Sequence, residues 1–154
     1  MPLSLTINGE AFVPDRDPMT PLIDILREDL ALTGAKAVCR EGFCGACVVL
    51  IDGEPVASCL IPAALAAGRP ILTIEGLSRP DEPTPLQKAL EAHDVVQCGM
   101  CFPGMTLTLT SLLSANPNPT REEIKHGLVG NICRCTGYER IIDAVLAHAA
   151  DLRG

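Results

Sequence analysis

The first half of the chain alternates short apolar runs with turn residues. Runs at residues 3–7, 48–51 and 71–74 are rich in leucine, isoleucine and valine, which is typical of strands. Asn8-Gly9 follows the first run and Asp52-Gly53 follows the second, and each pair suits a two-residue hairpin turn. This pattern predicts a small sheet that contains two hairpins.

A single helix is expected between the first two of these runs. Thr20 followed by Pro21 has the form of an N-cap and a proline at the first helical position. The apolar residues that then share one face are Leu22, Ile23, Leu26 and Leu30. Strands packed on one helix indicate an α+β, ferredoxin-like domain over residues 1–77.

The apolar spacing changes to a helical period in the second half, where four segments place apolar side chains on one face. These segments are residues 86–92, 105–115, 122–128 and 141–152. Thr120 and Glu123 have the spacing of a capping box at the start of the third segment. Residues 85–154 are therefore expected to form an all-α domain of four helices. Residues 78–84 are rich in proline and charge, and they are expected to link the two domains.

The charge balance and hydropathy exclude some partners. The 154 residues include 19 acidic and 12 basic side chains, a formal net charge of -7, so a nucleic-acid partner is not expected. No apolar run reaches the about 18 residues of a membrane span. The N-terminus lacks a basic stretch followed by an apolar core, so no export signal is visible and a cytoplasmic location is expected.

Eight cysteines fall into two separated quartets. The first quartet is Cys39, Cys44, Cys47 and Cys59, and the second is Cys98, Cys101, Cys133 and Cys135. The first has the C-x4-C-x2-C spacing of a plant-type [2Fe-2S] site, with a fourth ligand from a later segment. The second has a C-x2-C pair and a distant C-x-C pair, which could close a second tetrathiolate site. We therefore predict two metal centres.

Disulfides and structural zinc are the rival interpretations. Disulfide scaffolds are small secreted domains that cannot build a core, whereas this chain is 47% hydrophobic. Zinc remains open for the second quartet because C-x2-C pairs often bind zinc, although the Cys133–Cys135 spacing is narrow for it. Glycines favour the cluster interpretation for the first quartet. Gly42 and Gly45 leave backbone amides bare to face an anionic core, and they allow the positive φ that a loop wrapped around such a core is expected to need.

The three histidines, Arg134 and Tyr138 are the other candidates for a chemical role. His93, His126 and His148 lie on predicted helices without a second ligand at metal spacing, so solvated surface histidines are expected. Arg134, between two cysteines, would either ease the addition of an electron or pair with a partner. Tyr138 is expected to pack at a domain or subunit boundary. No catalytic set and no phosphate-binding loop is visible, so no catalytic residue is predicted on this chain.

Three motifs together resemble the small iron–sulfur subunit of the molybdenum hydroxylases, the xanthine oxidase family, over nearly the whole chain. The motifs, in family order, are Cys39-Arg-Glu-Gly-Phe-Cys-Gly-Ala-Cys47 with Ser58-Cys59, Gln97-Cys98-Gly-Met-Cys101-Phe-Pro-Gly-Met105, and Gly130-Asn-Ile-Cys133-Arg-Cys135-Thr-Gly-Tyr138. One departure is Phe102, where the family more often has threonine. The resemblance implies a β-grasp [2Fe-2S] domain followed by a four-helix [2Fe-2S] domain.

The resemblance also implies cofactors and partners. The helical-domain cluster would lie nearer a molybdenum–pterin cofactor held by a large subunit, with Gln97 and Cys135 approaching the pterin. A medium subunit would carry FAD, and the complex would be a dimer of heterotrimers. Because the chain ends at Gly154, soon after the last predicted helix, the molybdenum and flavin domains are expected on other polypeptides.

Two functions from different classes follow. The leading one is an electron-transfer subunit of a molybdenum hydroxylase that oxidises an N-heteroaromatic compound, or else an aldehyde or carbon monoxide, by analogy with the family. The alternative is a free-standing two-cluster ferredoxin that diffuses between partners. A blander possibility is a zinc-stapled interaction module.

Overall fold

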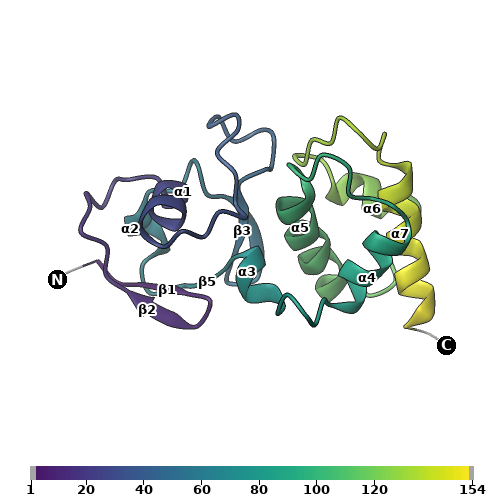
Figure 1. The fold of residues 1–154 in the computed structure, drawn as a ribbon, viewed down its shortest axis with the longest axis horizontal. Coiled ribbons are helices and arrows are strands. Elements are labelled where there is room, and N and C mark those ends of the chain that lie inside the picture. The colour runs from purple at the N-terminus through teal and green to yellow at the C-terminus, as the bar shows by residue number, and fades with distance from the viewer. Residues whose placement is uncertain (1–2, 153–154) are drawn as a thin grey trace.

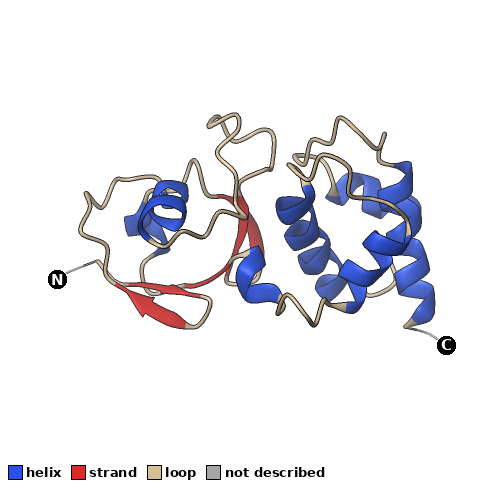
Figure 2. Cartoon of the chain, in the orientation of Figure 1, coloured by secondary structure: helices blue, strands red, loops and turns tan. Residues whose placement is uncertain are grey.

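The computed structural model describes residues 3–152 of the chain. A sheet with short helices forms one half of the molecule and a bundle of longer helices forms the other (Figures 1 and 2). The N-terminal half is α+β and the C-terminal half is all-α, so the predicted fold class and its order along the chain are confirmed.

The sheet has five short strands in the order β2-β1-β5-β3-β4. The strands are β1 (Leu5–Ile7), β2 (Glu10–Phe12), β3 (Val48–Ile51), β4 (Glu54–Ala57) and β5 (Pro70–Leu72). Both predicted hairpins are present, because Asn8 and Asp52 have φ of 52° and 55° and each precedes a positive-φ glycine. β1 and β5 pair in parallel, while the other neighbours are antiparallel. Strand β5 was predicted to reach residue 74, but it ends at Leu72 because Ile74 begins a helix.

The predicted helix of the first half begins one residue later than expected and changes its winding. It comprises α1 (Leu22–Asp24) and a π-helical turn, η1 (Ile25–Asp29). Thr20 is not the N-cap, because Pro21 occupies that position with ψ of 134° and bridges Pro62. The predicted apolar face is confirmed: Leu22, Ile23 and Leu26 are fully buried, and Leu30 packs against the same core. Two further short helices, α2 (Ala63–Ala66) and α3 (Ile74–Leu77), were not predicted.

The C-terminal half contains the four predicted helices. They are α4 (Pro85–Ala92), α5 (Phe102–Ala115), α6 (Arg121–Gly127) and α7 (Glu139–Asp151). The capping box of Thr120 and Glu123 is confirmed at the start of α6. Helix α5 begins at Phe102 rather than at Met105, because the proline of its first turn needs no hydrogen-bond partner there. The predicted linker is a loop between α3 and α4, and the exact domain boundaries stay a prediction.

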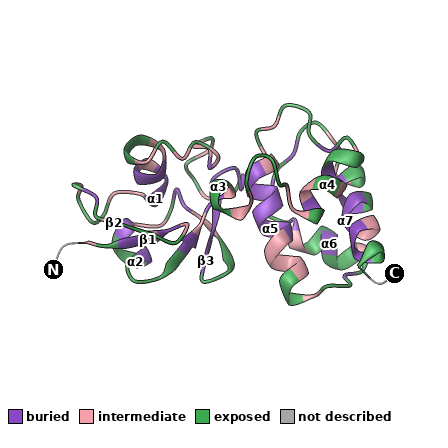
Figure 3. Ribbon diagram, turned by 60° about the horizontal axis from the view of Figure 1, so that its bottom comes forward, coloured by how far each residue is buried: buried purple, intermediate pink, exposed green. Residues whose placement is uncertain are grey.

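The two halves share a small core of their own. Val48 and Leu50 on β3 pack against Leu107 on α5, and all three are buried. Figure 3 shows that α5 is mostly buried along the part that faces the sheet. The first turns of α5 therefore sit against the strand that follows the first cysteine loop. This packing fixes the two halves relative to each other.

The histidines behave differently from one another. His126 is exposed as expected, and His93 is half-buried with its Nδ1 atom 2.9 Å from the Ala89 carbonyl oxygen. His148 is only 9% exposed, so the prediction of a surface histidine is wrong there. The cause is helical phase: His148 follows Ala144 and Val145 on the buried face of α7. Within residues 3–152, no helix is long and apolar enough to cross a membrane.

Candidate metal centres

The first quartet is assembled by one loop and one hairpin. Cys47 directly precedes β3, and Cys59 follows the end of β4, so the hairpin returns the chain to its own start. The buried hydroxyl of Ser58 reinforces this by donating to the Cys47 carbonyl oxygen at 2.6 Å. Cys44, Cys47 and Cys59 are buried and Cys39 is half-exposed. Sequence reasoning quoted Ser58 as part of a motif but missed this role.

The loop from Cys39 to Cys47 follows an unusual backbone path. Arg40, Gly42 and Gly45 all have positive φ, of 56°, 79° and 73°. A Cβ atom on Gly42 would lie 2.2 Å from a side-chain carbon of Leu60, so only glycine fits there without a shift. The prediction that these two glycines supply positive φ is confirmed. This path turns backbone amides toward the thiols: the Glu41 amide donates to the Cys39 sulfur at 3.4 Å.

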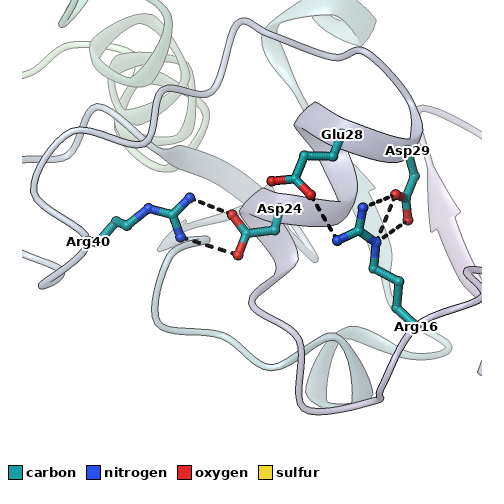
Figure 4. Close-up of polar contacts among 5 residues, drawn as sticks. All are labelled: Arg16, Asp24, Glu28, Asp29 and Arg40. Atoms are coloured by element: carbon teal, nitrogen blue, oxygen red, sulfur yellow. Dashed lines mark hydrogen bonds and ion pairs between the residues drawn. The ribbon is translucent and has the colours of Figure 1, made fainter.

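An ion pair ties the loop to the neighbouring helix. Arg40 donates to both carboxylate oxygens of Asp24, with the Nη2–Oδ1 distance 2.7 Å (Figure 4). Nearby, Arg16 pairs with Glu28 at 2.9 Å and with Asp29, which lie at the end of the same helical segment. The Arg40 side chain is about half-exposed, so the pair orients the loop more than it stabilises the fold.

The second quartet is assembled from two loops that are far apart in sequence. Cys98 and Cys101 lie between α4 and α5, with Cys101 as the N-cap of α5. Cys133 and Cys135 lie between α6 and α7. One small cavity joins all four thiols, and its lining residues are Val95, Val96, Gln97, Cys98, Gly99, Cys101, Phe102, Cys133 and Cys135. The predicted pterin-contact residue Gln97 is thus at the same site.

Tyr138 holds the C-x-C loop in place. Its hydroxyl accepts a hydrogen bond from the Cys133 backbone amide at 2.9 Å, and its own amide donates to the Thr136 hydroxyl oxygen at 3.1 Å. That hydroxyl also lies 3.1 Å from the Cys133 sulfur. Tyr138 therefore packs on the core of the helical half, beside a predicted ligand, and its place at a domain or subunit boundary stays a prediction. The sequence signal that could have indicated this contact is the short separation of Tyr138 from Cys133, five residues.

The thiols of each quartet approach one another in two pairs. The strongest thiol–thiol interactions join Cys39 with Cys44, Cys47 with Cys59, Cys98 with Cys135 and Cys101 with Cys133. A two-iron core takes two ligands on each iron, whereas one zinc ion gathers all four around a point. Two pairs of thiols are the ligand arrangement that a two-iron core would use.

The thiols of each quartet also differ in acidity. The Glu41 amide, 3.4 Å from the Cys39 sulfur, lowers the pKa of Cys39 to about 6. The Met100 amide likewise lowers the pKa of Cys98. Burial raises the pKa of Cys59 to about 11 and that of Cys101 to about 12. Cys39 is therefore the more acidic thiol of the first quartet, whereas Cys59 and Cys101 would need the charge of a metal to lose their protons near neutral pH.

The two quartets meet solvent differently. Cys98 and Cys135 are exposed, as is Gln97 beside them. Two large apolar side chains flank these residues at the surface, Val96 at 47% and Met100 at 45% exposure. One side of the second quartet is thus open.

Comparisons with known proteins agree with both halves. Residues 5–73 match the family described as a 2Fe-2S iron-sulfur cluster binding domain, and residues 73–146 match a [2Fe-2S] binding domain. The small FeS subunit of nicotinate dehydrogenase from Eubacterium barkeri is 46% identical over 93% of this chain and 91% of that protein. The small subunit of nicotine 6-hydroxylase from Paenarthrobacter nicotinovorans is also 46% identical, over 94% of this chain and 87% of its own length.

A solved structure extends the likeness to three dimensions. A chain of quinoline 2-oxidoreductase from Pseudomonas putida 86 superimposes with a TM-score of 0.92 at 46% identity, covering 99% of this chain and 96% of that one. The two relatives that are matched over most of their own length and named as small subunits are parts of multi-subunit oxidoreductases, which favours the subunit over the free ferredoxin. The chain belongs to the family of small iron–sulfur subunits of the molybdenum hydroxylases, with two [2Fe-2S] domains and an electron-transfer role in an oxidoreductase.

Proposed function

We propose that the two cysteine quartets each hold one [2Fe-2S] cluster and that the chain relays single electrons between two partner subunits. The metal ligands would be Cys39, Cys44, Cys47 and Cys59 for the first cluster, and Cys98, Cys101, Cys133 and Cys135 for the second. Such clusters take up and release one electron at a time without breaking covalent bonds. The observation that carries the proposal is that the four thiols of each quartet lie together, while only the second quartet has exposed thiols.

The exposed side of the second quartet is the proposed contact with the large, molybdenum-carrying subunit. Gln97 and Cys135 line the second site and are exposed, so both are accessible to a cofactor held by another chain. A glutamine amide both donates and accepts hydrogen bonds, which suits the amide-like edge of a pterin. Val96 and Met100 supply apolar surface around it, as the centre of a protein interface requires.

The first quartet is proposed to serve the acceptor, an FAD on a medium subunit. Cys39 is its one half-exposed thiol, and the loop presents the apolar side chains of Val38 and Phe43, each 54% exposed. Apolar surface at this loop would let a flavin-bearing partner approach the only open edge of an otherwise buried site. The assembly would be a dimer of heterotrimers in the cytoplasm.

The substrate of the complete enzyme is proposed to be an N-heteroaromatic compound. Relatives named for nicotinate, nicotine, caffeine and quinoline all act on compounds of this class. Aldehyde oxidoreductases are also similar, at 42% and 38% identity, and they make an aldehyde the second candidate. The small subunit itself would carry no substrate site.

Purification of the tagged chain from its native host tests the proposal. We expect two larger chains to co-purify, one with molybdenum and one with FAD, and nicotinate or quinoline added without oxygen to reduce the iron–sulfur chromophores. A colourless chain with bound zinc would overturn the cluster assignment. A brown chain that always purifies alone would instead favour the diffusible ferredoxin.

A further inference from the structure

The loops of the two quartets meet at a single backbone hydrogen bond. The Ile132 amide donates to the Cys44 carbonyl oxygen at 2.8 Å. Cys44 is a predicted ligand of the first cluster, and Ile132 directly precedes Cys133, a predicted ligand of the second. Figure 1 shows the two loops on the same side of the molecule, where the halves face each other. The two sites are therefore joined by a path of covalent bonds and one hydrogen bond.

This contact depends on two glycines from different segments. A Cβ atom on Gly104, in the first turn of α5, would lie 2.1 Å from the Gly45 carbonyl oxygen. A Cβ atom on Gly45 would lie 2.3 Å from the Gly130 carbonyl oxygen. Neither obstacle is a flexible side chain, so any larger residue must push the backbones apart. We call Gly45 and Gly104 the glycine notch.

Gly104 is informative because local structure does not require it. It has no positive φ, and a glycine inside a helix is less favourable than an alanine. It is buried and carries no predicted ligand, so the close approach to Gly45 is the one structural reason for glycine there. Sequence reasoning placed Gly104 inside a cysteine motif but assigned it no role.

The surroundings hold the notch rigidly. Val48 and Leu50, just after the first loop, pack on Leu107 of α5. On the other side Asn131 is 5% exposed, and its amide donates to the Leu128 carbonyl oxygen at 3.0 Å. Because both sides are packed, the loop-to-loop distance is set by the residues in between.

We propose that the glycine notch positions the two cluster loops so that the Ile132–Cys44 hydrogen bond is the route of electron transfer between the sites. This rests on the proposed function, since it assumes a cluster in each quartet. One electron would pass from a reduced cluster in the second quartet to an oxidised one in the first, so the second would be oxidised as the first is reduced. No proton moves and no covalent bond changes. The two glycines of the notch would contribute only by setting the distance between the two cysteine loops.

Substitution of Gly104 tests the proposal in the full-length chain reduced anaerobically with dithionite, without any substrate. Gly104→Ala and Gly104→Ser should retain iron, acid-labile sulfide and both midpoint potentials. The magnetic interaction between the reduced clusters, seen as splitting in low-temperature EPR, should fall severalfold and fall further for serine. Gly127→Ala is the matched control, because its Cβ would meet only the flexible Leu112 side chain, at 3.1 Å.

An unchanged splitting in the Gly104 variants, with both clusters intact, would overturn the proposal. If a variant loses a cluster, a second measurement on the wild-type chain decides. With ¹⁵N-labelled isoleucine, pulsed EPR of the first cluster should show a nitrogen coupling that disappears in Ile132→Val, and a spectrum that this substitution leaves unchanged would refute the route. A wild-type chain that holds only one cluster, or zinc, would instead refute the proposed function, so the two failures are distinguishable.

Discussion

The two cysteine quartets differ in how the fold builds them. The first is local: a loop supplies three thiols and the following hairpin returns the fourth, and three of the four are buried. The second joins the α4–α5 and α6–α7 loops, and two of its four thiols are exposed. A site built locally and covered by its own chain is suited to shielding a cluster. A site built from distant loops with an open side is suited to contact with a partner.

The two sites also differ in how much of the fold must form before each is assembled. The first site needs β3, β4 and the preceding loop, which are close in sequence. The second needs four helices to pack before its two loops can meet, because Cys133 and Tyr138 belong to the core of the bundle. We therefore expect the second site to lose its cluster more readily when the fold is weakened.

Substitution of one ligand in each half should have the largest effect. Cys44→Ser should remove the first EPR signal and reduce iron from about four to about two per chain, since two [2Fe-2S] sites hold four irons. Cys133→Ser should remove the second signal and also destabilise the bundle, because Cys133 is 7% exposed within its core. Iron analysis, EPR and thermal unfolding measure these effects. Loss of both clusters from Cys44→Ser would show that the two sites do not assemble independently.

Gln97→Ala tests whether the open side of the second site is needed for turnover. We expect turnover of the assembled enzyme to fall, because the proposed pterin contact is lost, while both cluster signals and the iron content remain. Gln87→Ala is the control: it removes the capping side chain of α4, which lies in the same domain, and should leave turnover unchanged. Equal turnover in wild type and Gln97→Ala would remove Gln97 from the relay.

Tyr138→Phe should weaken only the second site. The change leaves the Cys133 amide without its acceptor, at a cost of about 1 kcal/mol of folding free energy. Chelator-induced loss of the second cluster should become faster, while the first cluster is lost at the wild-type rate. The two EPR signals followed over time measure this. Equal acceleration at both sites would mean that the effect is global rather than local.

The smallest expected effect is a pH dependence at the start of α6. The Thr120 amide and hydroxyl donate to the Glu123 carboxylate at 2.7 and 2.8 Å, and these bonds hold the pKa of Glu123 below its ordinary value. The stabilisation is fully present above the ordinary glutamate pKa of about 4.3 and is lost as pH falls through the lower pKa of the folded protein. Denaturant unfolding of wild type and Glu123→Gln should therefore differ more at pH 7 than under acid conditions. A difference that does not change with pH would contradict this.

Local signals in the sequence predicted most of the fold. Asn8-Gly9 and Asp52-Gly53 identified the hairpins, and Thr120 with Glu123 identified the start of α6, because each signal acts within a few residues. The cysteine spacing predicted two quartets, and the structure places each set together. Their assignment as ligands stays a prediction.

Features that depend on packing between distant segments were not predictable. The burial of His148 follows from the phase of α7 against the bundle. The Ile132–Cys44 bond joins residues from different domains, and only the glycines near it gave any signal. The bridge between Pro21 and Pro62 shifted the first helix for the same reason.

The shared core of Val48, Leu50 and Leu107 has a consequence for kinetics. Carriers whose domains swing on a flexible tether must diffuse between a loading and an unloading position, so their rates fall as the solvent becomes more viscous. Here apolar side chains from both halves pack in one core, so the two halves do not move relative to each other about the linker. Electron passage through this chain should therefore be insensitive to glycerol or sucrose, and any viscosity dependence of the complete enzyme would belong to its substrates and products.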